Sequence, residues 1–176
     1  MSPFSTSVAP AALCLTAVAL AGCASAPPAD LPADPSIAPP PAPSDAERAE
    51  VERTYRDFWR ITWNTTTDRS AEWDAEVRQV AGQELADQIA TRSRDQLASG
   101  VQLYGAVVAN VTSIEITGNH ANVQDCQDAS RAGQADVVSG APKTVGIPRN
   151  PVRAALSKGT DTRWRVDRVE FPGGEC

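Results

Sequence analysis

The Leu-Ala-Gly-Cys motif at residues 20–23 is the part of this chain whose residue types and spacing point most directly to a chemistry. It ends an apolar run over residues 11–21, which is shorter than the roughly 20 residues that a membrane-spanning helix needs. A short apolar run followed by small residues is typical of a cleaved secretory leader. Cleavage before Cys23 would free its thiol for thioether linkage to a diacylglyceryl group, whose two acyl chains suffice for stable anchoring. The sequence therefore predicts that residues 1–22 are a lipoprotein signal peptide and that Cys23 is lipidated.

This leader departs from the usual pattern in one respect. Residues 1–10 contain no Lys or Arg, whereas secretory leaders normally begin with a positively charged region. Either the charge of the α-amino group is sufficient, or the true start of translation lies upstream. A chance occurrence of the motif in an Ala-rich segment is the alternative to lipidation.

The remaining cysteines predict a disulfide. The chain has four Cys, of which Cys14 would leave with the leader and Cys23 would carry lipid. An even pair in a small extracytoplasmic domain favours a Cys126–Cys176 disulfide, with two free thiols or a metal pair as alternatives. A zinc site needs about four ligands and the chain has one His, so we expect no metal.

Composition divides the chain into a tether and a folded part. Residues 24–44 hold eight of the fourteen Pro and little that can be buried, which predicts a disordered, extended Pro/Ala-rich spacer. The folded part is then residues 45–176, the size of one domain. It carries 16 basic and 20 acidic residues, a formal charge of −4. That balance argues against a nucleic-acid partner.

The first half of the folded part has helical periodicity. Ser44 and Glu47 have the spacing of a capping box, and apolar side chains then recur at helical spacing as far as Trp63. Two shorter helices are predicted over residues 72–80 and 83–98.

The second half has the pattern of strands. Residues 101–117 are rich in Val, Ile, Tyr and Thr and predict one bent strand with a bulge at Gly105. Residues 129–147, interrupted by Gly, Ser and Pro, predict a long loop that is either a lid or partner-binding loop or a disordered excursion. The other predicted strands are 121–128, 151–156 and 163–171.

Helices followed by a four-stranded antiparallel meander are an α+β pattern. Within that pattern, residues 55–59, 123–126 with Asp128, 164–166 and the terminal Cys176 carry a resemblance to a known fold. Over residues 45–176 the chain resembles the NTF2-like, cone-shaped α+β fold, and more narrowly the lipoproteins of unassigned role that are common in actinobacteria. The resemblance implies N-terminal helices packed on a curved antiparallel sheet that leaves a cone-shaped pocket, and it implies no settled activity.

Catalytic candidates are few. His120 is the only His and lies in a Gly-Asn-His turn, where a solvated role is favoured over that of a base. Enzymes of the fold that the chain resembles use a pocket carboxylate, which draws attention to Asp125 as a general base. Strand alternation places Asp125 on one face with Val123, and burial would raise its pKa. The alternative, which we favour, is a structural carboxylate bonded to Arg153 or Arg165.

Aromatic residues are the other candidates for a site. Spaced along a helix, such residues usually fill the core, but they also line cavities that bind apolar ligands. The candidates for a pocket lining are Tyr55, Trp59, Trp63, Trp73 and Tyr104.

The function that the sequence favours is a non-enzymatic binding or assembly module in the cell envelope. Its expected partners are the bilayer, through Cys23, and an envelope protein or apolar small molecule, with homodimerisation through the open sheet face a further alternative. We expect no cofactor. The alternative function is a pocket enzyme, isomerase- or hydrolase-like, that uses Asp125.

Overall fold

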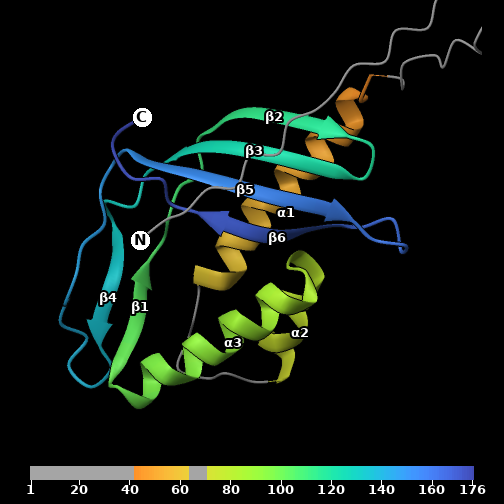
Figure 1. The fold of residues 1–176 in the computed structure, drawn as a ribbon. Coiled ribbons are helices and arrows are strands. Elements are labelled where there is room, and N and C mark those ends of the chain that lie inside the picture. The colour runs from red at the N-terminus through yellow and green to blue at the C-terminus, as the bar shows by residue number, and fades with distance from the viewer. Residues whose placement is uncertain (1–41, 64–70) are drawn as a thin grey trace, which may run out of the picture. The chain divides into compact units, whose positions relative to one another are not determined.

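The computed structural model describes residues 42–63 and 71–176. Backbone contacts divide the chain into the units Met1–Ala38 and Pro39–Cys176, and all described residues fall in the second. The predicted leader, the lipidation site Cys23 and most of the predicted tether therefore lie outside the described residues. Figure 1 shows the described unit, whose elements are α1 Asp45–Trp63, α2 Ala71–Val80, α3 Gln83–Ala98, β1 Val101–Gly105, β2 Val111–Thr117, β3 His120–Gln127, β4 Ala132–Asp136, β5 Asn150–Lys158 and β6 Trp164–Glu170.

Helix α1 begins as the capping pattern predicted. The Ser44 hydroxyl accepts a 3.2 Å hydrogen bond from the backbone N–H of Glu47. The Glu47 carboxylate, expected to turn back toward Ser44, pairs with Lys158 on β5 at 3.0 Å. The Lys158 ammonium also lies 5.5 Å from the centre of the Trp164 ring, so this contact fixes the start of α1 against the sheet.

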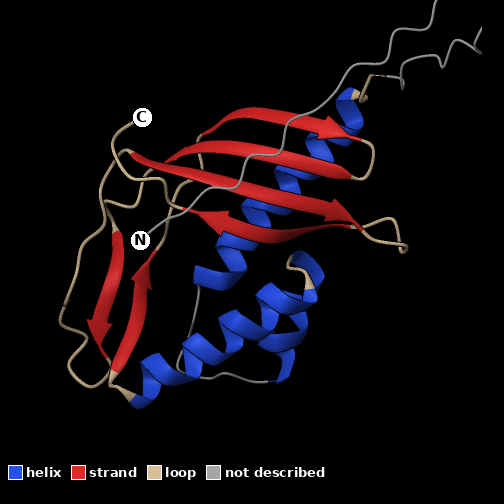
Figure 2. Cartoon of the chain, in the orientation of Figure 1, coloured by secondary structure: helices blue, strands red, loops and turns tan. Residues whose placement is uncertain are grey.

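The strands form two antiparallel sheets (Figure 2). One has four strands in the order β2-β3-β5-β6, and the other pairs β1 with β4. Helix α1 crosses the inner face of the four-stranded sheet, and α2 and α3 lie beyond the β6 edge (Figure 1). The predicted α+β class, helices packed on antiparallel sheets, is confirmed.

One strand prediction and one loop prediction were wrong. Residues 101–117 form β1 and β2, which belong to different sheets. The chain turns at Gly105, whose φ of 71° suits glycine and where an added Cβ would overlap the carbonyl oxygen of Arg131. The predicted loop 129–147 contains β4, which pairs with β1. The domain therefore has a second sheet that the expected meander of four strands lacks.

The core lies between α1 and the four-stranded sheet. Val51, Tyr55 and Phe58 are at most 3% exposed, and they share one side of α1 as their spacing predicted. Trp164 and Leu156, each 1% exposed, meet them from the sheet. None of the helices among the described residues is long and apolar enough to span a membrane.

Candidate functional site

A cavity of about 1390 Å³ lies between α3, the C-terminal half of α1 and strands β1 and β6. It exceeds the roughly 300–1,000 Å³ of an ordinary small-molecule pocket and is open to solvent on one side. Polar side chains of α3, among them Gln88, Arg92 and Gln96, stand along its margin. Its apolar wall is made of Phe58, Trp59, Trp63, Leu85, Ile89, Val101, Leu103, Val169 and Phe171.

The position of α3 creates the cavity. The backbone N–H of Gly82, just before α3, donates a 2.8 Å hydrogen bond to the carbonyl of Val166 in β6. This bond fixes the start of α3 to the sheet edge. Farther along α3, Leu85 and Ile89, four residues apart, present one apolar side toward the cavity and are only partly buried.

Three aromatic rings border the cavity. The ring centres of Trp59 and Trp63 are 6.4 Å apart, and those of Trp59 and Phe171 are 6.3 Å apart. The Trp63 indole N–H donates a 3.1 Å hydrogen bond to the carbonyl of Tyr104, which fixes that ring against β1. Phe171 is 57% exposed at the rim. The ring planes are inclined at 55° and 61° to one another, and together the rings give the cavity an apolar border against which an apolar ligand can pack.

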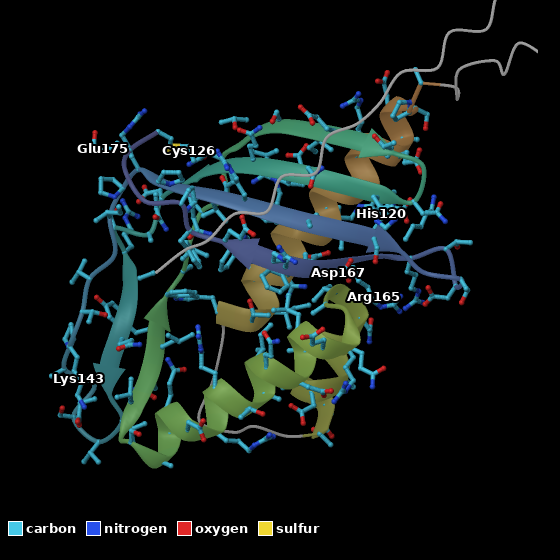
Figure 3. All side chains as sticks on the ribbon, in the orientation of Figure 1. His120, Cys126, Lys143, Arg165, Asp167 and Glu175 are labelled. Carbon is cyan, nitrogen blue, oxygen red and sulfur yellow. A yellow bond between two sulfur atoms is a disulfide. The ribbon has the colours of Figure 1, made fainter. Side chains whose placement is uncertain are left out.

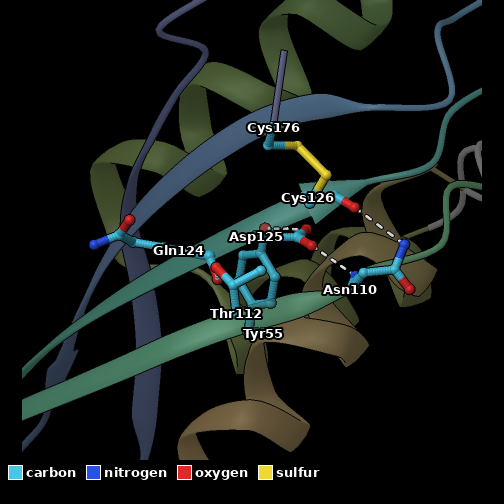
Figure 4. The surroundings of a disulfide bond; sticks show 7 residues. All are labelled: Tyr55, Asn110, Thr112, Gln124, Asp125, Cys126 and Cys176. Carbon is cyan, nitrogen blue, oxygen red and sulfur yellow. Dashed lines mark hydrogen bonds between the residues drawn. A yellow bond between two sulfur atoms is a disulfide. The ribbon is translucent and has the colours of Figure 1, made fainter.

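Asp125 lies elsewhere, buried between β3 and α1 at 3% exposure (Figure 4). One carboxylate oxygen accepts a 2.8 Å hydrogen bond from the Tyr55 hydroxyl, and the other accepts a 2.6 Å bond from the backbone N–H of Asn110. Burial raises the pKa of Asp125, and these two hydrogen bonds oppose the rise. Burial, and next the Asp125 charge, raise the pKa of Tyr55 as well. Both oxygens of this carboxylate are therefore engaged within the fold.

The structure places neither expected arginine against Asp125. Arg165 forms two hydrogen bonds with Asp161, at 2.9 and 2.7 Å. Arg153 pairs with Gln124 across β3 and β5, and both residues are exposed. The hydrogen-bond partners of Asp125 are instead Tyr55, which is distant in sequence on α1, and the backbone amide of Asn110. Asp125 is not among the residues that line the cavity.

The predicted disulfide is present. Cys126, the residue after Asp125 on β3, is bonded to Cys176, with a Cα–Cα distance of 5.7 Å. Figure 4 shows this bond above the Tyr55–Asp125 pair. The cystine ties the end of the chain to the central part of the sheet.

Of the five aromatic residues predicted to line a pocket, two line this cavity and three do not. Trp59 and Trp63 line the cavity. Tyr55 is in the core with Asp125, and Trp73 is 9% exposed with its indole N–H bonded to the carbonyl of Ile61 at 3.1 Å. Tyr104 donates through its hydroxyl to the carbonyl of Thr144.

The sequence alone did not identify the other apolar residues of the cavity wall as part of a site. The four-residue spacing of Leu85 and Ile89 within the predicted helix 83–98 is the one signal that could have marked them. His120 begins β3 at an exposed position. Within residues 42–63 and 71–176, no three His, Cys, Asp or Glu side chains come together as metal ligands would.

Comparisons with known proteins yield structural similarity alone. No protein-family model and no curated protein sequence matches the chain. The intermembrane space region of the chloroplast protein ARC6 superposes with a TM-score of 0.55 at 15% identity, covering 75% of this chain and 99% of that one. A ketosteroid isomerase-like protein from Erwinia carotovora atroseptica gives 0.46 at 11% identity, covering 72% and 95%. The transfer protein TraH of the Gram-positive conjugative plasmid pIP501 gives 0.48 at 9%, covering 74% and 98%.

Of these three, the ARC6 superposition has the score above 0.5, and at its low identity it shows a shared fold and nothing about activity. Function has to be argued from the site itself.

Proposed function

We propose that this protein is a lipid-anchored lipoprotein on the extracytoplasmic side of the membrane whose folded unit binds an apolar small molecule without catalysing a reaction. The single observation that carries the binding part is the aromatic and aliphatic cavity between α3, α1, β1 and β6. Binding there would remove Trp63, Phe171 and their apolar neighbours from water, which is the main driving force for such sites.

The geometry supports binding over catalysis. The carboxylate best placed by sequence to act as a base, Asp125, accepts hydrogen bonds at both oxygens and lies outside the cavity wall. A general base must reach the proton that it abstracts, directly or through one water. An enzyme that uses Asp125 is therefore the less favoured alternative.

The anchoring part rests on the motif that ends at Cys23. We expect the intact mass of membrane-extracted protein to show loss of residues 1–22, an acyl addition on Cys23 and two hydrogens missing from the Cys126–Cys176 pair. Cys23→Ser should lose the acyl mass and the cleavage. Cys14→Ser is the matched control, because that residue would leave with the leader, and it should behave as the unmodified chain. A Cys23→Ser protein with the same fractionation and N-terminus as the unmodified chain would refute anchoring.

The cavity is tested with the neutral fluorescent probe N-phenyl-1-naphthylamine, which brightens in apolar surroundings. The full chain should enhance its emission, and Ile89→Gln should weaken that binding because it places an amide in the apolar wall. Arg94→Gln, an exposed position on the same helix, is the matched control. Equal binding by both variants, with circular dichroism unchanged, would overturn the assignment of the cavity.

A further inference from the structure

A second hollow, of about 750 Å³, lies on the other side of β6. It includes exposed residues of the outer sheet face, such as Asn122, Gln124 and Arg153. It also shares part of its wall with the apolar cavity. Leu85, Gln88 and Val169, together with Glu84, border both spaces. The two hollows therefore adjoin each other beside β6 and α3.

The edge position of β6 explains why the two hollows adjoin. β6 is an edge strand of the four-stranded sheet, and the carbonyl of Val166 on β6 accepts a hydrogen bond from the backbone N–H of Gly82. The pairing register between β5 and β6 shifts at the next residue, so that Leu156 pairs with Val166 and Ala155 with Arg168. Asp167 is the extra residue, and it lies on β6 beside α3 (Figure 3), where a Cβ on Gly82 would overlap its carboxylate.

The two hollows differ in chemistry. The cavity wall is aromatic and aliphatic, whereas the second hollow carries charges of both signs. Two guanidinium groups, Arg153 and Arg168, stand among four carboxylates. One pair, Arg168 with Glu170, is in contact at 3.3 Å. The carboxylates are Glu84, Glu115, Asp167 and Glu170.

We infer that the two hollows form one site for an amphiphile with a single apolar chain and a zwitterionic head that bears a phosphate and a positively charged nitrogen. This inference rests on the proposed function, because the apolar chain of the ligand occupies the same apolar cavity. The head lies in the second hollow, where Arg153 pairs with the phosphate through its planar donors. The surrounding carboxylates, Glu84 and Glu115 among them, face the positively charged nitrogen. Charges of both signs complement a zwitterion, and they favour it over a purely anionic or purely cationic head.

The test measures binding of the purified full chain to lysophosphatidylcholine below its micelle-forming concentration, by titration calorimetry. A long-chain alcohol with the same number of carbons supplies the apolar chain without the charged head. Arg153→Gln should weaken lysophosphatidylcholine binding about tenfold, since it removes a charge-assisted hydrogen bond, and leave alcohol binding unchanged. Ile89→Gln should weaken binding of both. Arg149→Gln, an exposed arginine outside both hollows, is the matched control and should change neither.

The outcomes separate this inference from the proposed function. If Ile89→Gln weakens both ligands while Arg153→Gln changes neither, the head assignment is overturned and the apolar cavity stands. If the alcohol binds and lysophosphatidylcholine does not, the head assignment is likewise overturned and the apolar cavity stands. If a folded Ile89→Gln protein binds both ligands normally, both proposals fall. If Arg153→Gln reduces binding to phosphatidylcholine vesicles but Ile89→Gln has no effect on either ligand, the hollow is a membrane-contact surface and this inference is overturned.

Discussion

Helix α1 packs closely against the sheet along its first half and borders open space along its second half. Toward β3 and β5 its side chains meet a closely packed sheet, where Tyr55 is fully buried and Leu156 is 1% exposed. Toward α3 and β1, Trp63 borders a cavity of about 1390 Å³. Both regions draw on the same run of aromatic residues, because Tyr55, Trp59 and Trp63 follow one another at four-residue spacing. One helix therefore supplies both the core and the wall of the candidate site.

This difference in packing indicates that the filled region provides most of the stability of the fold and that the open region provides the binding surface. The filled region holds the buried carboxylate with its two hydrogen bonds and the adjacent disulfide. The open region holds partly buried side chains such as Leu85 and Ile89, which gain further burial when a ligand enters. Changes in the filled region should lower the free energy of unfolding, whereas changes in the open region should mainly lower affinity.

The largest effect on stability is expected from the disulfide. The double substitution Cys126→Ser/Cys176→Ser removes a cross-link across a sequence separation of 50. The chain-entropy model assigns such a loop about 4 kcal/mol of unfolding free energy. Urea titration followed by circular dichroism measures it. Reduction of the unmodified chain should reproduce the loss, and the same reductant should not affect the double variant. A double variant as stable as the parent would show that the cystine does not support the filled region.

Two leucines, Leu156 in the filled region and Leu103 in the open region, test whether the two regions differ in packing. Leu156→Ala should lower the free energy of unfolding by roughly 2–5 kcal/mol, because it opens a void in a packed core. Leu103→Ala should cost less than about 1 kcal/mol, since Leu103 already borders open space. It should instead weaken binding of an apolar probe. Equal losses of stability in urea titrations would mean that the two regions are packed alike.

Local signals in the sequence account for the helices and for most of the larger sheet. The capping pattern at Ser44 and the helical spacing of apolar side chains placed α1 correctly, and residues 83–98 form α3 as predicted. β4 escaped prediction because Ala132–Asp136 contains no β-branched or aromatic residue. The division between β1 and β2 depends on the approach of Gly105 to Arg131, which is far along the chain. Such contacts leave no local pattern.

The candidate site could be predicted only in part. Trp59 and Trp63 were recognisable because aromatic residues occur at the end of an amphipathic helix. Strand alternation correctly buried Asp125, but its partner Tyr55 lies 70 residues away in sequence. The charge of Asp125 suggested an arginine, whereas a hydroxyl on α1 and a backbone amide satisfy it. Tertiary packing determines such pairings, and the spacing of residues along a single sequence does not reveal them.

The smallest expected effect concerns pH and the buried carboxyl. Because burial raises the pKa of Asp125 in the fold above its ordinary 3.8, the folded state binds the proton more tightly than the unfolded state. The stabilising contribution of the protonated form is thus complete below pH 3.8 and is lost as pH rises through the raised pKa. Hydrogen bonds lower the pKa of Asp161 to about 2 and also lower the pKa values of Asp128 and Asp136, so these carboxyls act in the opposite direction at lower pH. The contribution of Asp125 is therefore read as the difference between the unmodified chain and an Asp125 variant at each pH.

Two substitutions sharpen this test. Asp125→Asn should abolish the decline in unfolding free energy just above pH 4, as measured by urea titration at several pH values. Tyr55→Phe removes the hydrogen bond that holds the pKa of Asp125 down, so the decline should extend to higher pH. It should also cost roughly 1–3 kcal/mol at neutral pH, because a buried carboxylate loses a donor. If Tyr55→Phe left both the pH profile and the stability unchanged, the Tyr55–Asp125 bond would not contribute to the filled region. The contrast between the two halves of α1 would then depend on apolar packing and the disulfide alone.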